Sequence, residues 1–286
     1  TDSGMSGQSG RLFGRDARLY VDNQYGLFSA GRMGAMVGGN GPYARFGHIL
    51  SPFSCGWGNV GGHLQVMALG YEYVDNALAW ASPKFAGFDA TLQYSNGTDA
   101  KNFGTGVEGK SSVERMYAGA LRYTHNDLMV IGGIERINYA QPSANDLGRK
   151  DAISYNLGGS YQAGWAKFYA YGQYFQNYTA AARTTTFALP SGVDGWGANV
   201  GVDVPVSHGF IKAGLGYGDF KGSKDSDRTM KTWQAAVGYL LPLSKRTSLY
   251  TAANYINSRY SDAQEAANPK AGKQVIDVIA GLMHKF

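Results

Sequence analysis

The sequence is poor in cysteine and in charge, and both shortages exclude classes of protein. Cys55 is the only cysteine among 286 residues, which excludes an intrachain disulfide framework and a metal site built from several cysteines. Charged residues make up 16% of the chain, and despite a net charge of +5 no basic run could serve as a nucleic-acid-binding arm. We therefore expect no nucleic-acid partner.

Long apolar runs are also missing. The longest, residues 128–134, is far shorter than the roughly 20 residues that a membrane-spanning helix needs. If such a chain crosses a membrane, it must do so as a closed β-barrel, the other structure that satisfies its backbone hydrogen bonds within lipid.

The residue constellations of an enzyme are absent as well. The five histidines show no metal-ligand spacing, and there is neither a phosphate-binding Walker loop nor a G-x-S-x-G nucleophile motif. Gly214, Gly216 and Gly218 recur at every second position of one expected strand, which favours glycines facing the inside of a barrel over a phosphate site. We expect no enzymatic activity, no cofactor and no metal.

The chain is rich in glycine, tyrosine and strand periodicity. Gly contributes 41 residues and Tyr 20, which favours strands and turns over helices. Residues 88–95 alternate between apolar and polar side chains, and about thirteen stretches of about 9 to 13 residues follow this period of a half-exposed strand. Short turns alternate with long polar loops, including residues 179–194, which is typical of outer-membrane barrels.

A soluble β-sandwich or propeller would also show many alternating strands. Two features favour a membrane barrel. Aromatic residues lie near strand ends on the apolar face, as at a membrane interface: Tyr94, Tyr123, Tyr161, Trp196, Trp233 and Tyr255. The other face carries mid-strand polar side chains that a water-filled interior accommodates and a packed core would not: Arg122, Lys167, Gln173, Asn199, Lys212 and Asn254.

Residues 34–70 interrupt the pattern of short strands. They contain ten glycines, two prolines and no Asp or Glu. Long loops in compact chains are usually functional or disordered, and the aromatic and aliphatic residues of this one argue against disorder. We predict that residues 34–70 fold into the barrel and narrow a pore, with Cys55 as a small apolar residue packed against the wall.

Four stretches resemble a known family. RLFGRDARLYV (residues 11–21) followed by YGLFSAGRM (25–33) resembles a strand pair of the Gram-negative general-diffusion porins, the trimeric 16-stranded type of β-proteobacteria. Residues 76–97 are similar to the strand pair after that family's constriction loop, residues 241–256 to its penultimate hairpin, and residues 281–286 to its terminal strand. Together the resemblance covers essentially the whole chain.

The resemblance implies an all-β fold, a transmembrane antiparallel up-and-down β-barrel in the outer membrane of a Gram-negative bacterium, assembled as a homotrimer. Its partners would be outer-membrane lipid and lipopolysaccharide, and the C-terminal Phe286 resembles the signal read by the outer-membrane assembly machinery. The implied function is ion transport and passive diffusion of small hydrophilic solutes through a water-filled channel.

Two features depart from the family pattern. Thirteen is an odd number of strands, whereas bacterial single-chain barrels use an even number. We therefore expect residues 1–286 to form a single porin domain that lacks about three of sixteen strands, before Leu12. The chain also ends in Met283-His284-Lys285-Phe286, whereas the family usually has an Arg before the terminal His.

The resemblance places constriction arginines on the barrel wall near the inserted loop. Arg15 matches a wall position, and Arg32 matches the GR pair leading into the loop, where it would line the pore or anchor the loop. Arg122 and Lys167 face inward by alternation alone, and Arg45 lies within the loop. Because the loop has no carboxylate, we predict a pore constriction of basic residues and an anion-selective channel.

Two other functions are compatible with the same pattern. Tyr169 and Tyr171 on an inward face would suit a substrate-selective porin with an aromatic track for sugars. A structural or adhesive surface barrel would instead use its long loops to bind partners.

Overall fold

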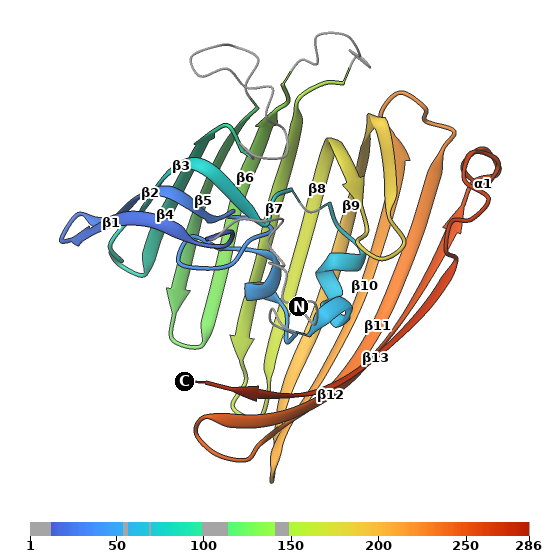
Figure 1. The fold of residues 1–286 in the computed structure, drawn as a ribbon. Coiled ribbons are helices and arrows are strands. Elements are labelled where there is room, and N and C mark those ends of the chain that lie inside the picture. The colour runs from blue at the N-terminus through green and yellow to red at the C-terminus, as the bar shows by residue number, and fades with distance from the viewer. Residues whose placement is uncertain (1–12, 54–56, 69, 99–113, 141–148, 286) are drawn as a thin grey trace.

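The computed structural model describes residues 13–53, 57–68, 70–98, 114–140 and 149–285. Within them thirteen strands form one antiparallel sheet, and each strand pairs with its neighbours in the sequence. Figure 1 shows the sheet curved into a trough, with the segment between β2 and β3 lying on its concave side. The predicted all-β, up-and-down arrangement of thirteen strands is confirmed. In this part of the chain β1 and β13 each pair with one neighbour, so the sheet is not closed.

In the described residues, the connections between strands also contain one short α-helix and three 3-10 helices. The bounds of the strands and helices are β1 Ala17–Asn23, β2 Gly26–Gly34, η1 Gly47–Leu50, η2 Gly58–Val60, η3 Gly62–Gln65, β3 Tyr73–Ala81, β4 Phe88–Asn96, β5 Arg115–His125, β6 Leu128–Asn138, β7 Ala152–Gln162, β8 Lys167–Ala181, β9 Phe187–Val206, β10 Gly209–Gly222, β11 Thr229–Pro242, β12 Thr247–Tyr260, α1 Asp262–Ala267 and β13 Gln274–His284.

Alternation gives the two faces of the sheet opposite chemistry. In β4, Leu92 on the convex face is 54% exposed, whereas Thr91 and Gln93 on the concave face are 1% and 3% exposed. Apolar side chains such as Leu157 and Val237 are likewise exposed on the convex face. A soluble protein would bury this face, so its exposure indicates that lipid or protein covers it.

Short and long connections lie at opposite ends of the strands. Residues 24–25, 126–127 and 207–208 form two-residue turns at one end. Longer connections lie at the other end, among them residues 261–273, which contain α1. Outer-membrane barrels place short turns on the periplasmic side and long loops outside the cell.

The prediction of a long polar loop at residues 179–194 was wrong. β8 and β9 extend through most of this stretch, and residues 182–186 alone connect them. The pairing of β8 with β9 shifts register on either side of Tyr178, and Asn177 and Ala182 adopt positive φ angles of 57° and 55°. Such bulges change which face a side chain occupies, so the alternation was not visible in the sequence. β9 reaches 20 residues, β8 15, and β10, β11 and β12 14 each, all longer than the predicted 9 to 13 residues.

Candidate channel site

The inserted segment, residues 35–72, is bound by a wall glutamine where it leaves β2. The N–H of Met36 donates to Oε1 of Gln93 at 2.8 Å, and Nε2 of Gln93 donates to the carbonyl of Gly34 at 2.9 Å. Alternation directs Gln93 from β4 into the trough, where it is buried. The last backbone bond between the two ends of the segment runs from the N–H of Ala35 to the carbonyl of Glu72, and Gln93 binds the next N–H, that of Met36, through its side chain.

Arg45 ties the next part of the inserted segment to the same wall. Its Nε donates to Oγ1 of Thr91 at 2.8 Å, and its other donors bind the carbonyls of Pro42 and Ala44. Burial, with the nearby positive charge of Arg122, lowers the pKa of Arg45 from its usual value. Because the guanidinium remains strongly basic, Arg45 brings a buried positive charge to the inner wall.

Glycines line the inner wall beneath the inserted segment. A Cβ atom at Gly158 on β7 would lie 2.5 Å from Cδ1 of Leu50. A Cβ atom at Gly201 on β9 would overlap the ring of Pro52. The other wall glycines in contact with the segment are Gly133, Gly197, Gly214, Gly216, Gly218 and Gly238. The glycine row of β10 expected from the sequence is therefore part of a seat that admits the segment close to the sheet.

Aromatic side chains of the inserted segment contact the wall at β12, on the opposite side of the trough from β4. The ring of Trp57 lies 5.0 Å from that of Tyr250 on β12, and Phe53 packs edge-on against Trp57 at 5.7 Å. The amide of Asn254 on β12 donates to the carbonyl of Asn59 at 3.2 Å. The segment therefore spans the trough from β4 to β12.

A second glutamine binds the end of the inserted segment. Oε1 of Gln173 on β8 accepts the N–H of Ala68 at 2.9 Å, while its Nε2 donates to Oδ1 of Asn156. Near Gly70, the buried carboxylate of Glu135 accepts the hydroxyl of Tyr178 at 2.9 Å. Gln93 and Gln173 were not singled out as loop anchors, although both are inward amides whose alternation could have marked them.

Most acidic side chains on the inner wall are held by a base. Ion pairs join Arg32 to Asp75 at 2.6 Å, Arg122 to Asp89 at 2.9 Å and Lys212 to Asp203 at 2.6 Å. Glu135, with Tyr178, and Asp277 on β13 lie on this face outside those pairs. Pairing cancels much of the field that each acid would otherwise project into the trough.

The predicted pore residues occupy different environments. Arg15 is exposed just before β1, and Arg32 binds Asp75 and the carbonyl of Gly14, so it anchors the segment's entry. Arg45 is buried at the wall, as described. Arg122 faces the trough beside Asp89 with its side chain 34% exposed. Cys55 lies outside the described residues.

Lys167 lies in an inward row with Asp203 and Lys212, which are paired across β8, β9 and β10. Asp203 uses one oxygen for Lys212 and accepts the hydroxyl of Tyr169 on the other. The ammonium of Lys167 lies instead over the ring of Tyr169 at 5.0 Å. Lys167 is therefore the member of the row whose charge is not engaged in a close ion pair among the described residues.

The aromatic pair proposed as a sugar track is separated. Tyr171 is buried, stacks on Phe46 of the inserted segment at 5.8 Å, and donates its hydroxyl to Asn156. Tyr169 remains at the trough surface, bound to Asp203. A continuous aromatic track through both tyrosines is not formed.

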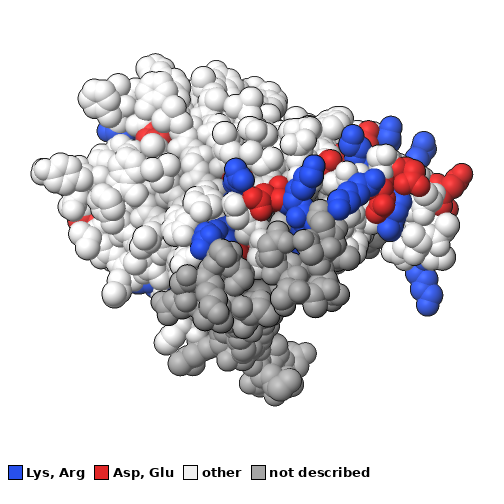
Figure 2. Space-filling view, turned by 90° about the horizontal axis from the view of Figure 1, so that it is seen from above, with Lys and Arg blue, Asp and Glu red and all other residues white. Residues whose placement is uncertain are grey.

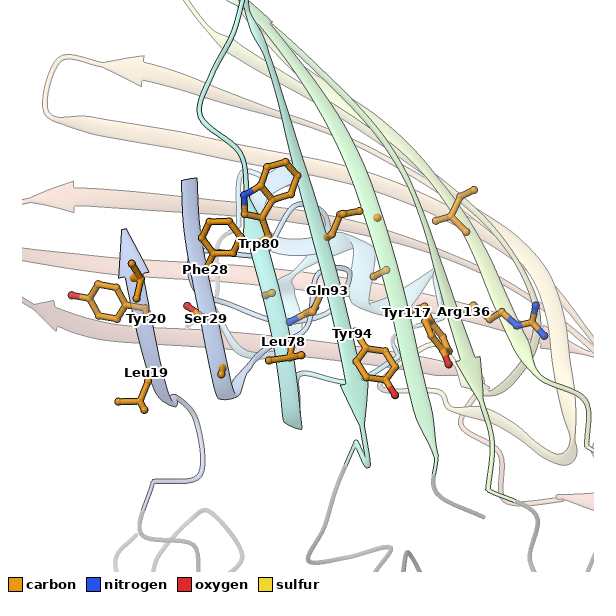
Figure 3. Close-up of a pocket in the computed structure, with 17 residues that line it drawn as sticks. Leu19, Tyr20, Phe28, Ser29, Leu78, Trp80, Gln93, Tyr94, Tyr117 and Arg136 are labelled. Atoms are coloured by element: carbon orange, nitrogen blue, oxygen red, sulfur yellow. The ribbon is translucent and has the colours of Figure 1, made fainter. Parts of the chain in front are cut away.

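The convex face carries aromatic residues and an apolar groove. Figure 3 shows Phe28, Leu78, Trp80, Tyr94 and Tyr117 lining this groove, of about 840 Å³, on β1–β6. Cross-strand aromatic pairs continue around the sheet, including Trp196–Tyr217 and Trp233–Tyr255. Aromatic pairs on an exposed apolar face are typical of membrane-interface girdles.

A metal site and a membrane-spanning helix each place requirements on the described residues. Over the described ranges, no cluster of three or more His, Cys, Asp or Glu side chains could hold a metal ion. In the same ranges, none of the helices has the length and apolarity to span a membrane.

An exposed apolar outer face, a polar inner face and an inserted segment across the trough together define a channel-forming barrel protein of the outer membrane. A family model described as Gram-negative porin matches residues 1–261. The chain belongs to the Gram-negative porin family, whose members are outer-membrane channels rather than enzymes. The predicted resemblance and location are confirmed.

Known relatives agree with this assignment. The chain is 27% identical over 316 residues to an outer membrane porin protein of Bordetella pertussis, an alignment that covers 99% of this chain and 75% of the relative. The fold matches an anion-selective porin from Comamonas acidovorans with a TM-score of 0.69 and 22% identity, covering 100% and 81% of the two chains. It also matches a loop L8 deletion mutant of OmpT from Vibrio cholerae with a TM-score of 0.66 and 13% identity, covering 97% and 82%.

Proposed function

We propose that this porin lets small hydrophilic solutes and ions diffuse through a water-filled channel that residues 34–70 narrow, with a preference for anions. One observation carries the proposal: residues 34–70, which contain no Asp or Glu, span the inner face from β4 to β12. A segment across the inner face reduces the open cross-section. The absence of acid on it removes the charge that would attract cations.

The charged side chains on the inner wall also favour anions. Asp75, Asp89 and Asp203 are each held in an ion pair, whereas Lys167 and Arg45 have no carboxylate in a close ion pair among the described residues. The charge that remains to act on a passing ion is positive at these two positions. The structural relative from Comamonas, itself described as anion-selective, is consistent with this sign.

Reversal potential in a salt gradient across a planar bilayer tests the selectivity. Preferential anion permeation is expected, and a reversal potential of the sign for cations would contradict it. Liposome swelling with sugars of graded size tests general diffusion, for which uptake should fall with solute size and not saturate.

A sugar-selective channel is the second candidate. Tyr169 at the trough surface favours it, but the burial of Tyr171 under Phe46 weighs against an aromatic track. Saturable swelling with one sugar would support this candidate over general diffusion. Absence of swelling would favour a structural or adhesive barrel.

A homotrimer is part of the proposal. The groove on β1–β6, with its exposed Phe28, Leu78 and Tyr117, is an apolar surface that a second copy of the chain would cover. A negative charge in this groove, introduced by Leu78→Glu, should weaken the contact between copies. Unheated samples of this variant should then migrate on a gel as monomers instead of trimers. Leu215→Glu on the outer face of β10 serves as the control, because it lies outside this groove.

Outer-membrane lipid and lipopolysaccharide are the proposed partners elsewhere on the convex face. Lys231 and Arg259 are directly opposite each other on β11 and β12, toward the long-loop end beyond the pair Trp233–Tyr255. Figure 2, a view from above, shows basic and acidic side chains gathered together toward the side of the molecule where Figure 1 places β11, β13 and α1. Asp219 lies 3.4 Å from the ammonium of Lys231 and offsets part of its charge, so a lipid phosphate would bind mainly to Arg259. Lys231→Gln with Arg259→Gln should reduce co-purifying lipopolysaccharide.

Closure and assembly complete the proposal. Among the described strands, β1 and β13 each have one unpaired edge, which would be costly in lipid, so we expect about three further strands to join them. A mass of the protein extracted from outer membranes no greater than that of these 286 residues would contradict this. Phe286, which lies outside the described residues, is the proposed contact for the assembly machinery, and its removal should slow insertion into the membrane.

A further inference from the structure

The connection between β8 and β9 folds inward onto the inserted segment. Three consecutive backbone N–H groups, of residues 182–184, donate to that segment. Their acceptors are Met67 O at 3.1 Å, Leu64 O at 2.7 Å and Gln65 Oε1 at 3.0 Å. Backbone groups at the end of a barrel hairpin would normally face water, so this engagement places the turn inside the trough.

The other side of the same turn is fixed to the wall. The hydroxyl of Ser258 donates to Oγ1 of Thr185 at 3.0 Å, and the hydroxyl of Tyr260 donates to the Thr185 carbonyl at 3.1 Å. Ala182 and Phe187 on either side are buried in the core that includes Ala68 of the inserted segment. The turn therefore bridges the segment and β12 and is held from both directions.

The turn carries an arginine into the trough. The guanidinium of Arg183 lies 3.6 Å from the carboxylate of Glu72, with the two side chains 46% and 59% exposed. Burial lowers the pKa of His48 in η1, and Glu72 and Arg183 act on it in opposite directions. The three side chains thus lie close together where the inserted segment meets the turn. Both charges are therefore in contact with water at this place.

We propose that residues 182–186 form a second wall of the constriction and that Arg183 is a selectivity-determining residue there. The inference rests on the proposed channel function and deepens it. A charge fixed beside a narrow aqueous path changes the energy of each passing ion, and low-dielectric walls strengthen the effect. Glu72 opposes Arg183, so the pair sets the local field by the difference between them.

Charge reversal is the direct test. Arg183→Glu should lower the anion-to-cation permeability ratio by roughly threefold to tenfold, the change expected from two unit charges acting several ångströms away in water. Glu72→Gln should raise the ratio. Lys273→Glu is the matched control, because Lys273 is a similarly exposed base paired with Glu265 in the connection between β12 and β13, and it should leave the ratio unchanged. Equal effects of Arg183→Glu and Lys273→Glu would overturn the proposal.

Two further readouts separate charge from structure. Arg183→Lys keeps the charge and the backbone N–H bond, so it should retain the wild-type ratio, and a loss in this variant would overturn the proposal in favour of a structural role. If the unmodified protein proves cation-selective but Arg183→Glu makes it more so, the anion preference fails while the role of Arg183 stands.

Discussion

The backbone of Met36 is bound by the side chain of Gln93, 57 residues further along the chain. The side-chain amide of Gln93 also donates to the carbonyl of Gly34, so it makes two hydrogen bonds to the backbone where the segment leaves β2. Both bonds lie out of water, so the amide and its backbone partners depend on each other for satisfaction. The position of the segment in the channel is therefore linked to one wall side chain at this end.

Replacing Gln93 by Leu should loosen the entry of the segment. The substitution leaves a buried N–H and a buried C=O without partners, at about 1–3 kcal/mol each. We expect greater open-channel current noise and a higher mean conductance in single-channel recordings. Gln234→Leu is the control, since this inward, buried glutamine on β11 makes no side-chain hydrogen bond in the described part of the chain. Indistinguishable recordings from the two variants would argue against the anchor.

Lys167→Gln should weaken the preference for anions. Its ammonium faces the trough beside Tyr169, while the neighbouring Asp203 is engaged by Lys212. Removing the charge of Lys167 leaves Lys212 and Asp203, whose charges cancel. The reversal potential in a KCl gradient should move toward the value for cations. Lys245→Gln, in the short turn between β11 and β12, should leave the potential where it was.

Gly197→Ala should displace the segment from its seat. A Cβ atom there would collide with the carbonyl of Val66, and overpacking of this kind costs about 1–3 kcal/mol. We expect altered conductance or a smaller fraction of protein that shows the heat-dependent gel shift of a folded barrel. Gly172→Ala on the convex face of β8 meets nothing closer than 3.9 Å and should behave as wild type. Wild-type channels from Gly197→Ala would show that the seat is not tight.

Glu114, just before β5, should make stability depend on pH. Burial raises its pKa from 4.5 to about 7 in the folded protein, and Thr98 donates to its carboxyl at 2.6 Å. The folded state therefore binds more protons than the unfolded state between pH 4.5 and about 7, so stability should fall as pH rises through this window. The loss is at most about 3 kcal/mol, because one pKa unit corresponds to about 1.4 kcal/mol.

Urea unfolding of detergent-solubilised protein at pH 5 and pH 8 measures this loss. Glu114→Gln resembles the protonated carboxyl at every pH, so it should reduce the difference between the two conditions. An unchanged difference in the variant would assign the pH dependence to other groups.

Outside residues 179–194, strand alternation was sufficient to predict the sheet and its two faces. Period-2 patterns placed Arg122, Lys167 and Gln173 inward and Trp196 and Trp233 outward, and the structure agrees. The composition of residues 34–70 marked them as different from the strands around them. These features are local, so a single sequence contains them.

The contacts of the trough could not be predicted in the same way. The bond from Asn254 to Asn59 joins residues 195 apart in the chain. The inward turn at residues 182–186 depends on two shifts of register that local alternation does not record. Pairing of Asp203 with Lys212 rather than Lys167 is likewise a choice between two register neighbours. Each of these contacts depends on residues that come together only when the sheet has formed.

The wall glycines have a consequence for folding. They lie on five strands, from Gly133 on β6 to Gly238 on β11, and they form one continuous seat only when those strands are staggered correctly. A slip of one residue between two strands would turn a side chain into the place of Leu50, Pro52 or Val66. The segment can therefore dock only on a correctly aligned wall. If the segment docks after the sheet has formed, it would bind only barrels whose strands are correctly aligned. The channel would then stay wide until the barrel is complete.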